Sequence, residues 1–364
     1  MSIFTKSLLN SDWLEELSMN QEINKVTRND VARHAGVSPS TVSYVINNGP
    51  RPVSDTTRRK VLKAIDDLGY RPNAVARNLR LQSTKTVGLI IPDTCNTYFA
   101  EVAEGIESVA YDNDYMVVFC NSDYQLAREL SYIDHLYAER AAGIIIIPAT
   151  SSTKSLKSLL KTNIPSVSLD RAAQGIDIPS IVANNFRGGY LATKHLISLG
   201  HKKIGCISRP VELSHATERM SGYLAVLKDA GVSPKSSWLA KGGYRMENGR
   251  KAMTELLDLA DPPTAVFCYN DMMAIGALRC AHERGLSVPN NLSIVGFDDI
   301  TEASFTCPAL TTIHQDKYEM GRRGMKLLLD LIQKKADAHL PGLPPLDVKL
   351  IIRESTGPIA SNTK

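Results

Sequence analysis

Residues 27–48 constrain the fold more than any other stretch, because they predict two short helices joined by a tight turn. Thr27 is a good N-cap for the first helix, and Gly36 is the residue type at which helices commonly end. Ser38 caps the second helix, and Pro39 follows it at a position where a missing N–H costs nothing. This pattern predicts a helix-turn-helix, a motif with which many proteins read DNA.

The outer face of the second helix is expected to carry mostly small side chains with hydroxyl groups. Val42, Val45 and Ile46 recur at i, i+3 and i+4 and form its buried stripe. The residues left outside are Ser40, Thr41, Ser43 and Tyr44. Small hydroxyl side chains let the helix backbone approach base edges and phosphates closely. We therefore expect this face to contact DNA.

Positive charge is concentrated around the same motif. Residues 26–86 hold eleven Lys and Arg against four Asp and Glu, a net charge of +7, whereas the whole chain carries +4. A basic surface alone would be an ordinary solvated face. Next to a helix-turn-helix, it is where contacts with DNA phosphates are needed.

Further segments extend the pattern to the end of the chain. The motif reads NDVARHAGVSPSTVSYVINN at 29–48, followed by VSDTTR at 53–58, LGYRPNAVARNL at 68–79, VGFDD at 295–299 and PALTTIHQ at 308–315. In this order they resemble the lactose/galactose repressor family of bacterial transcriptional regulators. The resemblance implies a DNA-binding head followed by a core whose bound effector controls operator affinity.

The head is expected to span residues 26–71. Residues 53–68 predict a third helix that Ser54 caps and Gly69 ends. Its apolar stripe is expected to consist of Val61, Leu62, Ile65 and Leu68.

Residues 72–86 predict a hinge, because a helical segment follows Pro72 and is too short to be stable alone. The resemblance implies that two such helices enter the DNA minor groove together, with Leu79 between base pairs and Arg77 and Arg80 beside it. The alternative that Leu79 packs beneath the core stays open. The complete set of expected DNA contacts is Thr27, Ser38, Pro39, Ser40, Thr41, Ser43, Tyr44, Asn48, Arg77, Leu79 and Arg80.

Residues 87–364 are α/β in character. Apolar strand-like runs alternate with helical stretches, and continuous Val and Ile runs are typical of parallel strands buried on both faces. The runs are 87–92, 116–121, 143–148, 166–169, 204–207, 265–269 and 292–297. The resemblance adds two subdomains like those of periplasmic sugar-binding proteins, with parallel sheets and a cleft between them.

Polar and aromatic residues directly follow several of these runs, and parallel sheets bind ligands outside the carboxyl ends of their strands. Carboxylates, amides and guanidinium groups suit the hydroxyls of a sugar, and aromatic rings suit its C–H face. The residues after the runs are Asn96, Tyr98, Phe99, Asp170, Arg171, Asn270, Asp271, Asp298 and Asp299. For Asp170 and Asp271, capping of the next helix is an equal alternative.

The resemblance assigns further roles. It implies that Arg219, three residues before Gly222 and Tyr223, binds effector oxygens, as does Asp298. Tyr244 matches an aromatic residue that covers a ring. His215 and Leu213 lie on a variable loop that selects the ligand. The chain departs from the family in having Ala183 before Asn184, where many members have Asp. The predicted effector set is Asn96, Tyr98, Phe99, Asp170, His215, Arg219, Tyr244, Asn270 and Asp298.

Composition indicates a cytoplasmic protein without metal site, cofactor or membrane partner. The chain is 43% hydrophobic but has no run long enough to span a membrane. Residues 1–25 contain acids and do not resemble a signal peptide; a tail or an early start codon explains them better than a partner-binding helix. The six cysteines lie mostly in apolar runs, as reduced core residues do.

These patterns predict a transcriptional repressor rather than an enzyme, since no phosphate-binding loop or nucleophile elbow is present. We expect a homodimer on a palindromic operator, and no tetramer, because the segment after Arg353 has no heptad repeat. A sugar effector that releases DNA is favoured, with a purine or nucleoside as the alternative. A cytosolic sugar-binding protein or sugar-modifying enzyme would not explain the basic head.

Overall fold

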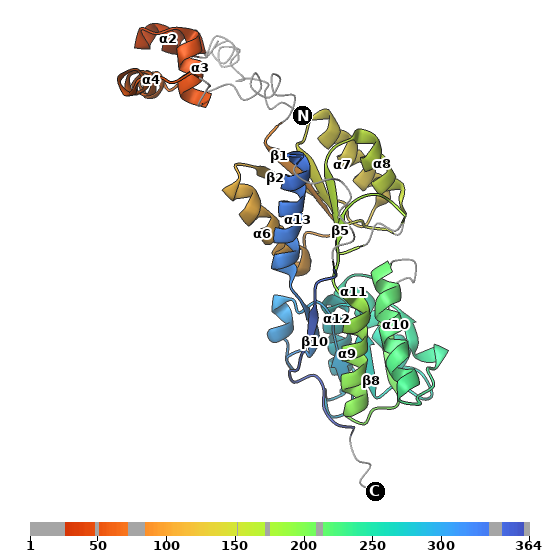
Figure 1. Ribbon diagram of the computed structural model, residues 1–364. Helices are drawn as coiled ribbons and strands as arrows, with labels where there is room; N and C mark the ends of the chain where they lie inside the picture. Colours follow the sequence, from red (N-terminus) through yellow and green to blue (C-terminus); the bar gives the residue numbers. More distant parts are fainter. Residues whose placement is uncertain are drawn as a thin grey trace, which may run out of the picture. The chain divides into compact units, whose positions relative to one another are not determined.

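The computed structural model describes residues 26–47, 51–71, 84–150, 152–171, 175–208, 214–334 and 344–359. The chain forms two compact units, Met1–Leu81 and Gln82–Lys364 (Figure 1). The hinge helix expected within 72–86 and the residues Asn48, Arg77, Leu79 and Arg80 lie outside the described residues. The predicted boundaries 1–25, 26–71, 72–86 and 87–364 therefore stay predictions.

The described residues of the first unit form three helices around a small apolar core: α2 (Arg28–Ala35), α3 (Pro39–Asn47) and α4 (Asp55–Asp67). At the start of α2, the Thr27 N–H donates to the Asp30 carboxylate over 2.9 Å, and the Asp30 N–H donates back to the Thr27 hydroxyl. Gly36, with φ +67°, ends α2 in a left-handed conformation that favours glycine. Val42 and Val45 are buried, as the stripe on α3 predicted.

One expectation for the head is wrong. Leu62 was placed on the buried stripe of α4, but it is 50% exposed, whereas Val61 and Ala64 are almost fully buried. Neighbouring helical residues point about 100° apart, so a narrow core cannot bury both Val61 and Leu62 equally well. The helix contacts the core through Val61 and Ala64, which are three residues apart.

The first subdomain of the second unit is built on a five-stranded parallel sheet with the order β2-β1-β3-β4-β5. Its strands are β1 (Thr86–Ile91), β2 (Met116–Asn121), β3 (Gly143–Ile146), β4 (Ser166–Leu169) and β5 (Ser180–Ile181). Helices α6 (Thr97–Asp112) and α13 (Lys317–Ile332) cover one face, and α7 (Leu126–Ala138) and α8 (Lys154–Thr162) cover the other. Along β1, Leu89 packs toward the first pair of helices and Ile90 toward the second.

The second subdomain repeats this plan with a four-stranded parallel sheet of order β7-β6-β8-β9. Its strands are β6 (Ile204–Ser208), β7 (Leu239–Lys241), β8 (Ala265–Cys268) and β9 (Ser293–Val295). Its α-helices are α9 (Asn185–Ser198), α10 (Ser214–Asp229), α11 (Met246–Leu257) and α12 (Asp271–Glu283), and it also has the short 3-10 helices η1 (Ser236–Trp238) and η2 (Thr301–Ser304).

The chain passes between the two subdomains at three places: between β5 and α9, between β10 (Thr312–Gln315) and α13, and before β11 (Val348–Ile351). The crossing segments are joined to one another, since Ala183 pairs with Leu346 and β10 pairs antiparallel with β11. Connections gathered at one side of a cleft form a hinge, so the carboxyl ends of both sheets can face one another across it.

The predicted α/β class is confirmed, and each of the seven predicted runs overlaps a strand. Among the described residues, four strands were not predicted: β5, β7, β10 and β11. Among the cysteines, Cys120, Cys206, Cys268 and Cys280 are buried, but Cys95 and Cys307 are exposed rather than core residues. Within the described ranges, no helix has the length and apolar character needed to cross a membrane.

Candidate functional site

The helix-turn-helix presents α3 with its hydroxyl groups held in place. The Ser38 hydroxyl accepts from the Thr41 N–H at 3.1 Å and lies 2.9 Å from the Thr41 hydroxyl, so Ser38 caps α3 as expected. Ser38, Pro39 and Ser40 are exposed, whereas Thr41, Ser43 and Tyr44 are half-buried. The exposed start of α3 offers backbone N–H groups and small side chains, which suits contact with DNA.

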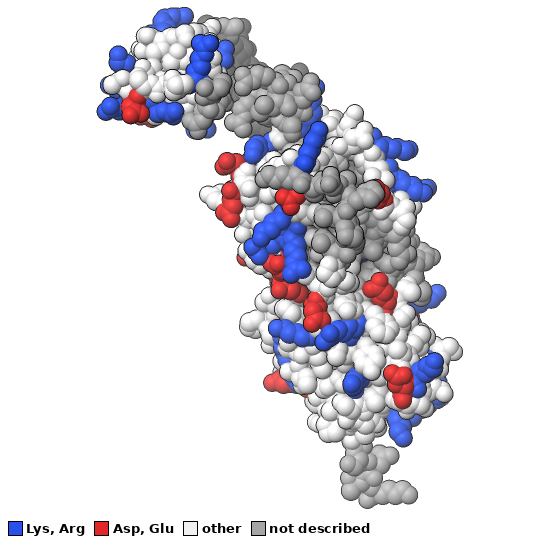
Figure 2. Space-filling view, viewed as in Figure 1, with Lys and Arg blue, Asp and Glu red and all other residues white. Residues whose placement is uncertain are grey.

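Thr27 caps the start of α2, and its hydroxyl donates to the Asp30 carboxylate over 2.6 Å. This hydrogen bond is the main reason why the pKa of Asp30 lies below its usual value. The described part of the head holds eight Lys and Arg against four acids. Basic side chains predominate on the face of the head shown in Figure 2.

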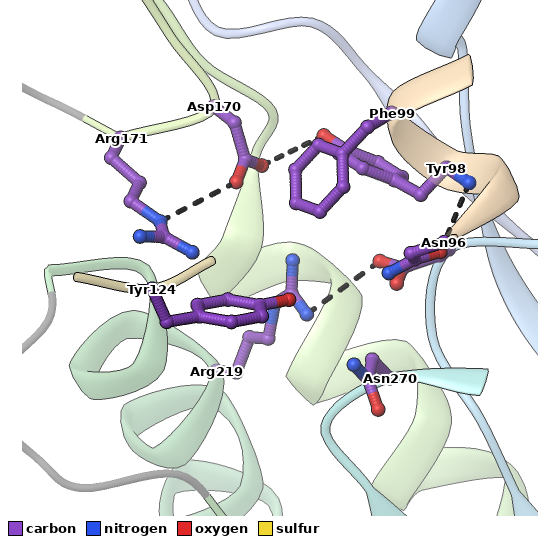
Figure 3. A pocket seen from close by; sticks show the side chains of 9 residues that line it. Asn96, Tyr98, Phe99, Tyr124, Asp170, Arg171, Arg219 and Asn270 are labelled. Carbon is purple, nitrogen blue, oxygen red and sulfur yellow. Dashed lines mark hydrogen bonds and ion pairs between the residues drawn. The ribbon is translucent and has the colours of Figure 1, made fainter. Parts of the chain in front are cut away.

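A pocket of about 20 Å³ lies in the second unit, between residues of both subdomains. It brings together seven of the nine residues predicted to bind the effector, although they are up to 202 positions apart in the sequence (Figure 3). The lining residues are Asn96, Tyr98, Phe99, Tyr124, Asp170, Arg171, Arg219, Asn270 and Asp298.

The first subdomain contributes a carboxylate and two rings to this pocket. The Tyr98 hydroxyl donates to the Asp170 carboxylate over 2.7 Å, and the rings of Tyr98 and Phe99 meet edge to face at 5.2 Å. Burial raises the pKa of Tyr98 well above its usual value, helped by the charge of Asp170, so the hydroxyl keeps its proton. Asp170 has φ +63°, and this left-handed conformation turns the chain at the end of β4.

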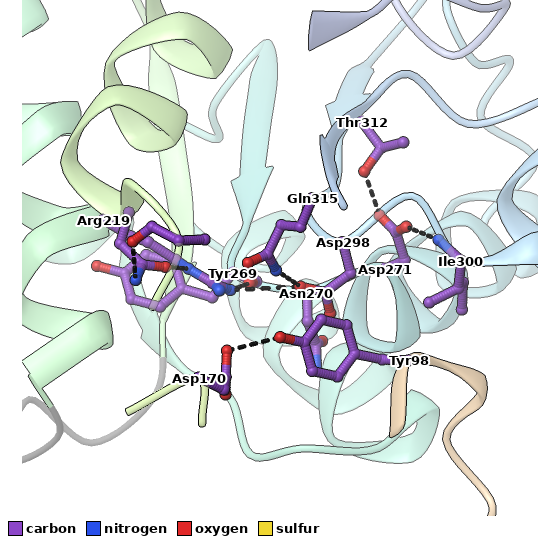
Figure 4. Close-up of polar contacts among 12 residues, drawn as sticks. Tyr98, Asp170, Arg219, Tyr269, Asn270, Asp271, Asp298, Ile300, Thr312 and Gln315 are labelled. Atoms are coloured by element: carbon purple, nitrogen blue, oxygen red, sulfur yellow. Dashed lines mark hydrogen bonds and ion pairs between the residues drawn. The ribbon is translucent and has the colours of Figure 1, made fainter. Parts of the chain in front are cut away.

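The second subdomain contributes Arg219 from α10, which is only 3% exposed (Figure 4). Its Nε donates to Asn185 Oδ1 over 2.8 Å, its Nη1 donates to the Tyr269 carbonyl, and its guanidinium lies 3.6 Å from the centre of the Phe297 ring. Packing explains why glycine stands at position 222, three residues after Arg219. A Cβ on Gly222 would collide with the Phe186 carbonyl, so glycine allows α10 to cross α9 closely enough to hold Arg219 in place.

Asp298 faces Arg219 from the end of the second sheet. Its carboxylate accepts from Gln315 Nε2 over 2.7 Å and lies 3.7 Å from Arg219 Nη1. Its carbonyl accepts from the buried ammonium group of Lys317 at 2.9 Å. Since Gln315 and Lys317 belong to the crossing between β10 and α13, the position of Asp298 is tied to the hinge.

Two amides of the pocket act as helix caps. Asn96 Oδ1 accepts from the Tyr98 N–H at the start of α6, and Asn270 Oδ1 accepts from the Met273 N–H at the start of α12. The alternative that Asp170 and Asp271 cap helices is wrong. Asp271 is the first residue of α12, after the N-cap Asn270, and its buried carboxylate accepts from the Thr312 hydroxyl and the Ile300 N–H; burial raises its pKa well above the usual value.

Known proteins resemble both units. Residues 27–73 match the model of the bacterial regulatory proteins of the lacI family, and residues 84–341 match that of the periplasmic binding proteins and sugar-binding domain of the LacI family. The chain belongs to the lacI family. It is a DNA-binding transcriptional repressor with a ligand-binding core, and not an enzyme.

Individual lacI family members are similar over nearly their whole length. The HTH-type transcriptional repressor PurR of Proteus mirabilis (strain HI4320) is 40% identical over 333 residues, which cover 90% of this chain and 96% of that protein. The lac repressor dimer bound to operator and the anti-inducer ONPF has a TM-score of 0.80 at 30% identity, covering 91% and 99%. The transcriptional regulator CelR in complex with cellobiose has a TM-score of 0.70 at 29% identity, again covering 91% and 99%.

The predicted effector set lacked two residues that line the pocket, Tyr124 and Arg171. Arg171 had been noted as following the run 166–169 but was not included in the set. Tyr124 was not noted, although it follows β2 and the rule that ligands bind at the carboxyl ends of strands applies to it as well. Two predicted residues are not among those lining the described pocket. Tyr244 stands behind Tyr124, with ring centres 3.8 Å apart, and His215 is buried near the start of α10.

A set of contacts beside the pocket connects the two subdomains. We call this set of contacts the latch. Arg245 of the second subdomain donates to Asp93 over 3.0 Å and to Asp123 over 2.8 Å, both in the first. Tyr124 stacks on Tyr244 beside these bonds. Asp123 and Tyr124 have φ of +50° and +56°, conformations that cost about 1–2 kcal/mol per residue. Because its contacts join the two subdomains, the latch forms only when they are close together, in a closed cleft.

Proposed function

We propose that this repressor binds a palindromic operator as a homodimer and that a sugar bound between the two subdomains of the core lowers its operator affinity. One observation carries the proposal. The pocket gathers carboxylates, guanidinium groups, amides and rings from both subdomains, and seven of these side chains were singled out for sugar binding. Such a mixture suits the hydroxyls and C–H faces of a carbohydrate.

The mechanism of control is closure of the cleft. Because the pocket of about 20 Å³ holds no more than one water molecule, a sugar has to enter an open form. Asp298 is held by the crossing between β10 and α13, so a ligand that pulls on Asp298 and Asp170 shifts one subdomain against the other. A hundredfold preference for one form supplies about 2.7 kcal/mol per site, enough to change operator occupancy.

The proposed DNA contacts lie in the head and the hinge. Pro39, Ser40 and Tyr44 read bases; Ser38, Thr41 and Ser43 contact the backbone beside them. Thr27, Asn48 and the hinge residues Arg77, Leu79 and Arg80 complete the interface, with Leu79 entering the minor groove. Binding of chromosomal operators places the protein in the cytoplasm. The lac repressor, to which the chain is similar, is a dimer on its operator.

A purine or nucleoside is the second candidate effector, favoured by the aromatic side chains at the pocket. Tyr98, Phe99 and Tyr124 line it, and Tyr124 and Tyr244 are stacked with 25° between their planes. Flat ligands bind well between such rings.

The test has two steps. Operator sites are first selected from random DNA with the full chain, and the binding is measured by gel shift against scrambled DNA. Neutral sugars, nucleosides and nucleobases are then added to the complex. Release by a sugar supports the proposal. Tighter binding with a purine would replace the sugar by the second candidate, and failure to select any site would contradict operator binding itself.

A further inference from the structure

One buried peptide group in the first subdomain is held from both sides. The Pro148 carbonyl accepts from Nη1 of Arg171, and the Ala149 N–H, which belongs to the same peptide group, donates to the Glu129 carboxylate. A trans peptide group is planar and its carbonyl and N–H point in opposite directions, so a rotation of this group would break both hydrogen bonds. We call Glu129, the Pro148–Ala149 peptide group and Arg171 the peptide clamp.

The parts of the peptide clamp come from three elements. The peptide group follows β3, Arg171 follows β4, and Glu129 lies in the first turn of α7. Arg171 lines the pocket, whereas Glu129 is fully buried and is not among the lining residues. The peptide clamp therefore connects a side chain of the pocket to a helix that contributes none of the described lining residues.

The peptide clamp leaves one edge of the Arg171 guanidinium group for the pocket. Nη1 is occupied by the Pro148 carbonyl, whereas Nε and Nη2 have no hydrogen-bond partner among the described residues, and Nε lies 3.7 Å from the Asp170 carboxylate. Figure 3 shows this guanidinium group at the pocket, beside Asp170. An arginine side chain has much rotational freedom, so the contact that fixes Nη1 also decides where the opposite edge points.

Glu129 is a costly residue at this position, because burial of a carboxylate is unfavourable. Burial raises the pKa of Glu129, and the Ala149 N–H, the Ser155 hydroxyl and the charge of Arg171 lower it in part. Ser155 lies nearby without a direct hydrogen bond, and Oε2 of Glu129 has no hydrogen-bond partner among the described residues. The hydrogen bond of this carboxylate thus goes to the peptide group that also holds Arg171.

We propose that Glu129 is a positioning residue of the effector pocket. By fixing the Pro148–Ala149 peptide group, it holds the Arg171 guanidinium group in the orientation in which the Nε–Nη2 edge faces the pocket. Glu129 acts only through the peptide group and Arg171 and touches no ligand. The inference rests on the proposed effector pocket, but it does not depend on the class of effector.

Nuclear magnetic resonance observes the peptide clamp in the full chain without any effector. The sequence contains two Pro–Ala pairs, Pro148–Ala149 and Pro308–Ala309, so a sample with ¹³C-carbonyl proline and ¹⁵N-alanine gives two correlated amide signals. The Ala309 N–H also donates to a glutamate, the exposed Glu354, over 2.9 Å. Its signal is therefore an internal reference for that of Ala149.

The Nε–H of Arg171 reports on the guanidinium group itself, and its signal is identified by its absence in Arg171→Lys. The Nε–H of Arg219 is the matched reference. Arg219 is also 3% exposed, and it donates this hydrogen to Asn185 over 2.8 Å in the second subdomain. A change confined to the first subdomain leaves the Arg219 signal in place.

Two substitutions of Glu129 separate positioning from folding. Glu129→Leu removes the acceptor of the Ala149 N–H, so we expect this amide to exchange with solvent at least about tenfold faster and the Arg171 Nε–H signal to shift. Glu129→Gln keeps an oxygen that accepts from the Ala149 N–H, so it should restore both signals. Ile133→Val is the control, because it removes a buried methyl group one turn later in α7, which lowers the thermal midpoint but leaves the Arg171 signal unchanged.

The consequence for binding is measured by calorimetric titration of the same variants with cellobiose, ribose and adenine. A probe that binds the parent chain should bind Glu129→Gln within about threefold and Glu129→Leu at least about tenfold more weakly, because the Arg171 edge is no longer held in place. Ile133→Val should bind it like the parent.

The outcomes separate this inference from the proposed function. An unchanged Arg171 Nε–H signal in Glu129→Leu, or equal changes in Glu129→Leu and Glu129→Gln, would overturn the positioning role. Equal affinities of all variants for a probe that binds would overturn it as well. If neither sugar binds the parent chain, the result counts against the sugar effector, whereas the Ala149 and Arg171 signals still decide the role of Glu129.

Discussion

The latch allows a quantitative prediction for Arg245→Met. This substitution keeps the apolar stem of the side chain and removes the bonds to Asp93 and Asp123, which connect the two subdomains. Arg250→Met is a matched control. Arg250 also binds two carboxylates, Glu247 at 3.0 Å and Glu283 at 3.4 Å, but all three residues belong to the second subdomain. Only the first substitution should change the balance between open and closed forms.

The size of the effect follows from burial. The Arg245 side chain is 56% exposed, whereas that of Asp93 is 4% exposed. Exposed ion pairs contribute about 0.2–1 kcal/mol and hydrogen bonds to charged groups about 1.5–3 kcal/mol. Because solvent screens the arginine, we take about 1–2 kcal/mol for both contacts together. The ratio of closed to open molecules should then fall by a factor of about 5–30 in Arg245→Met.

The chain offers its own labelling sites for this measurement. Cys95 and Cys307 are exposed and lie in different subdomains, and the other four cysteines are buried. Nitroxide labels on both report the distance between subdomains by electron spin resonance. We expect a larger long-distance population for Arg245→Met, and for the parent chain in 1 M salt because salt screens the partly exposed latch. Equal distance distributions in Arg245→Met, Arg250→Met and the parent chain would refute the latch.

Arg219→Ala should abolish the response to any sugar that releases DNA, with ligand-free operator affinity within about tenfold of the parent in a gel shift; loss of both would indicate a folding role instead. Tyr44→Ala should change the ranking of operator variants by about 1–3 kcal/mol at the base it reads, and a uniform loss across all variants would contradict base reading. Burial lowers the pKa of His201, so the stabilising contribution of its neutral form is complete above pH 6.5 and is lost as the pH falls below it. Urea midpoints at pH 7 and pH 5 should therefore differ less in His201→Gln than in the parent.

Local sequence patterns were sufficient to predict the features that depend on neighbouring residues in the chain. The Thr27 and Ser54 caps, the turn at Gly36 and the start of α3 at Pro39 depend on neighbours within a few residues, and all were predicted. The long Val and Ile runs predicted buried parallel strands because their burial on both faces requires continuous apolar sequence. The rule that ligands bind beyond the ends of such strands was enough to bring seven side chains to one pocket.

Only the tertiary structure decided what depends on contacts between distant residues. The two-residue strand β5 exists because β4 offers it a partner, and its own sequence is too short to specify it. Tyr98 binds Asp170 across 72 positions and Arg245 binds Asp93 across 152, so neither the carboxylate at the pocket nor the latch is visible in a local pattern. The same holds for Arg171, whose unused donors become evident only when its neighbours are in place. Sequence specifies the residue types at each strand end, whereas packing of the two subdomains determines which of them meet.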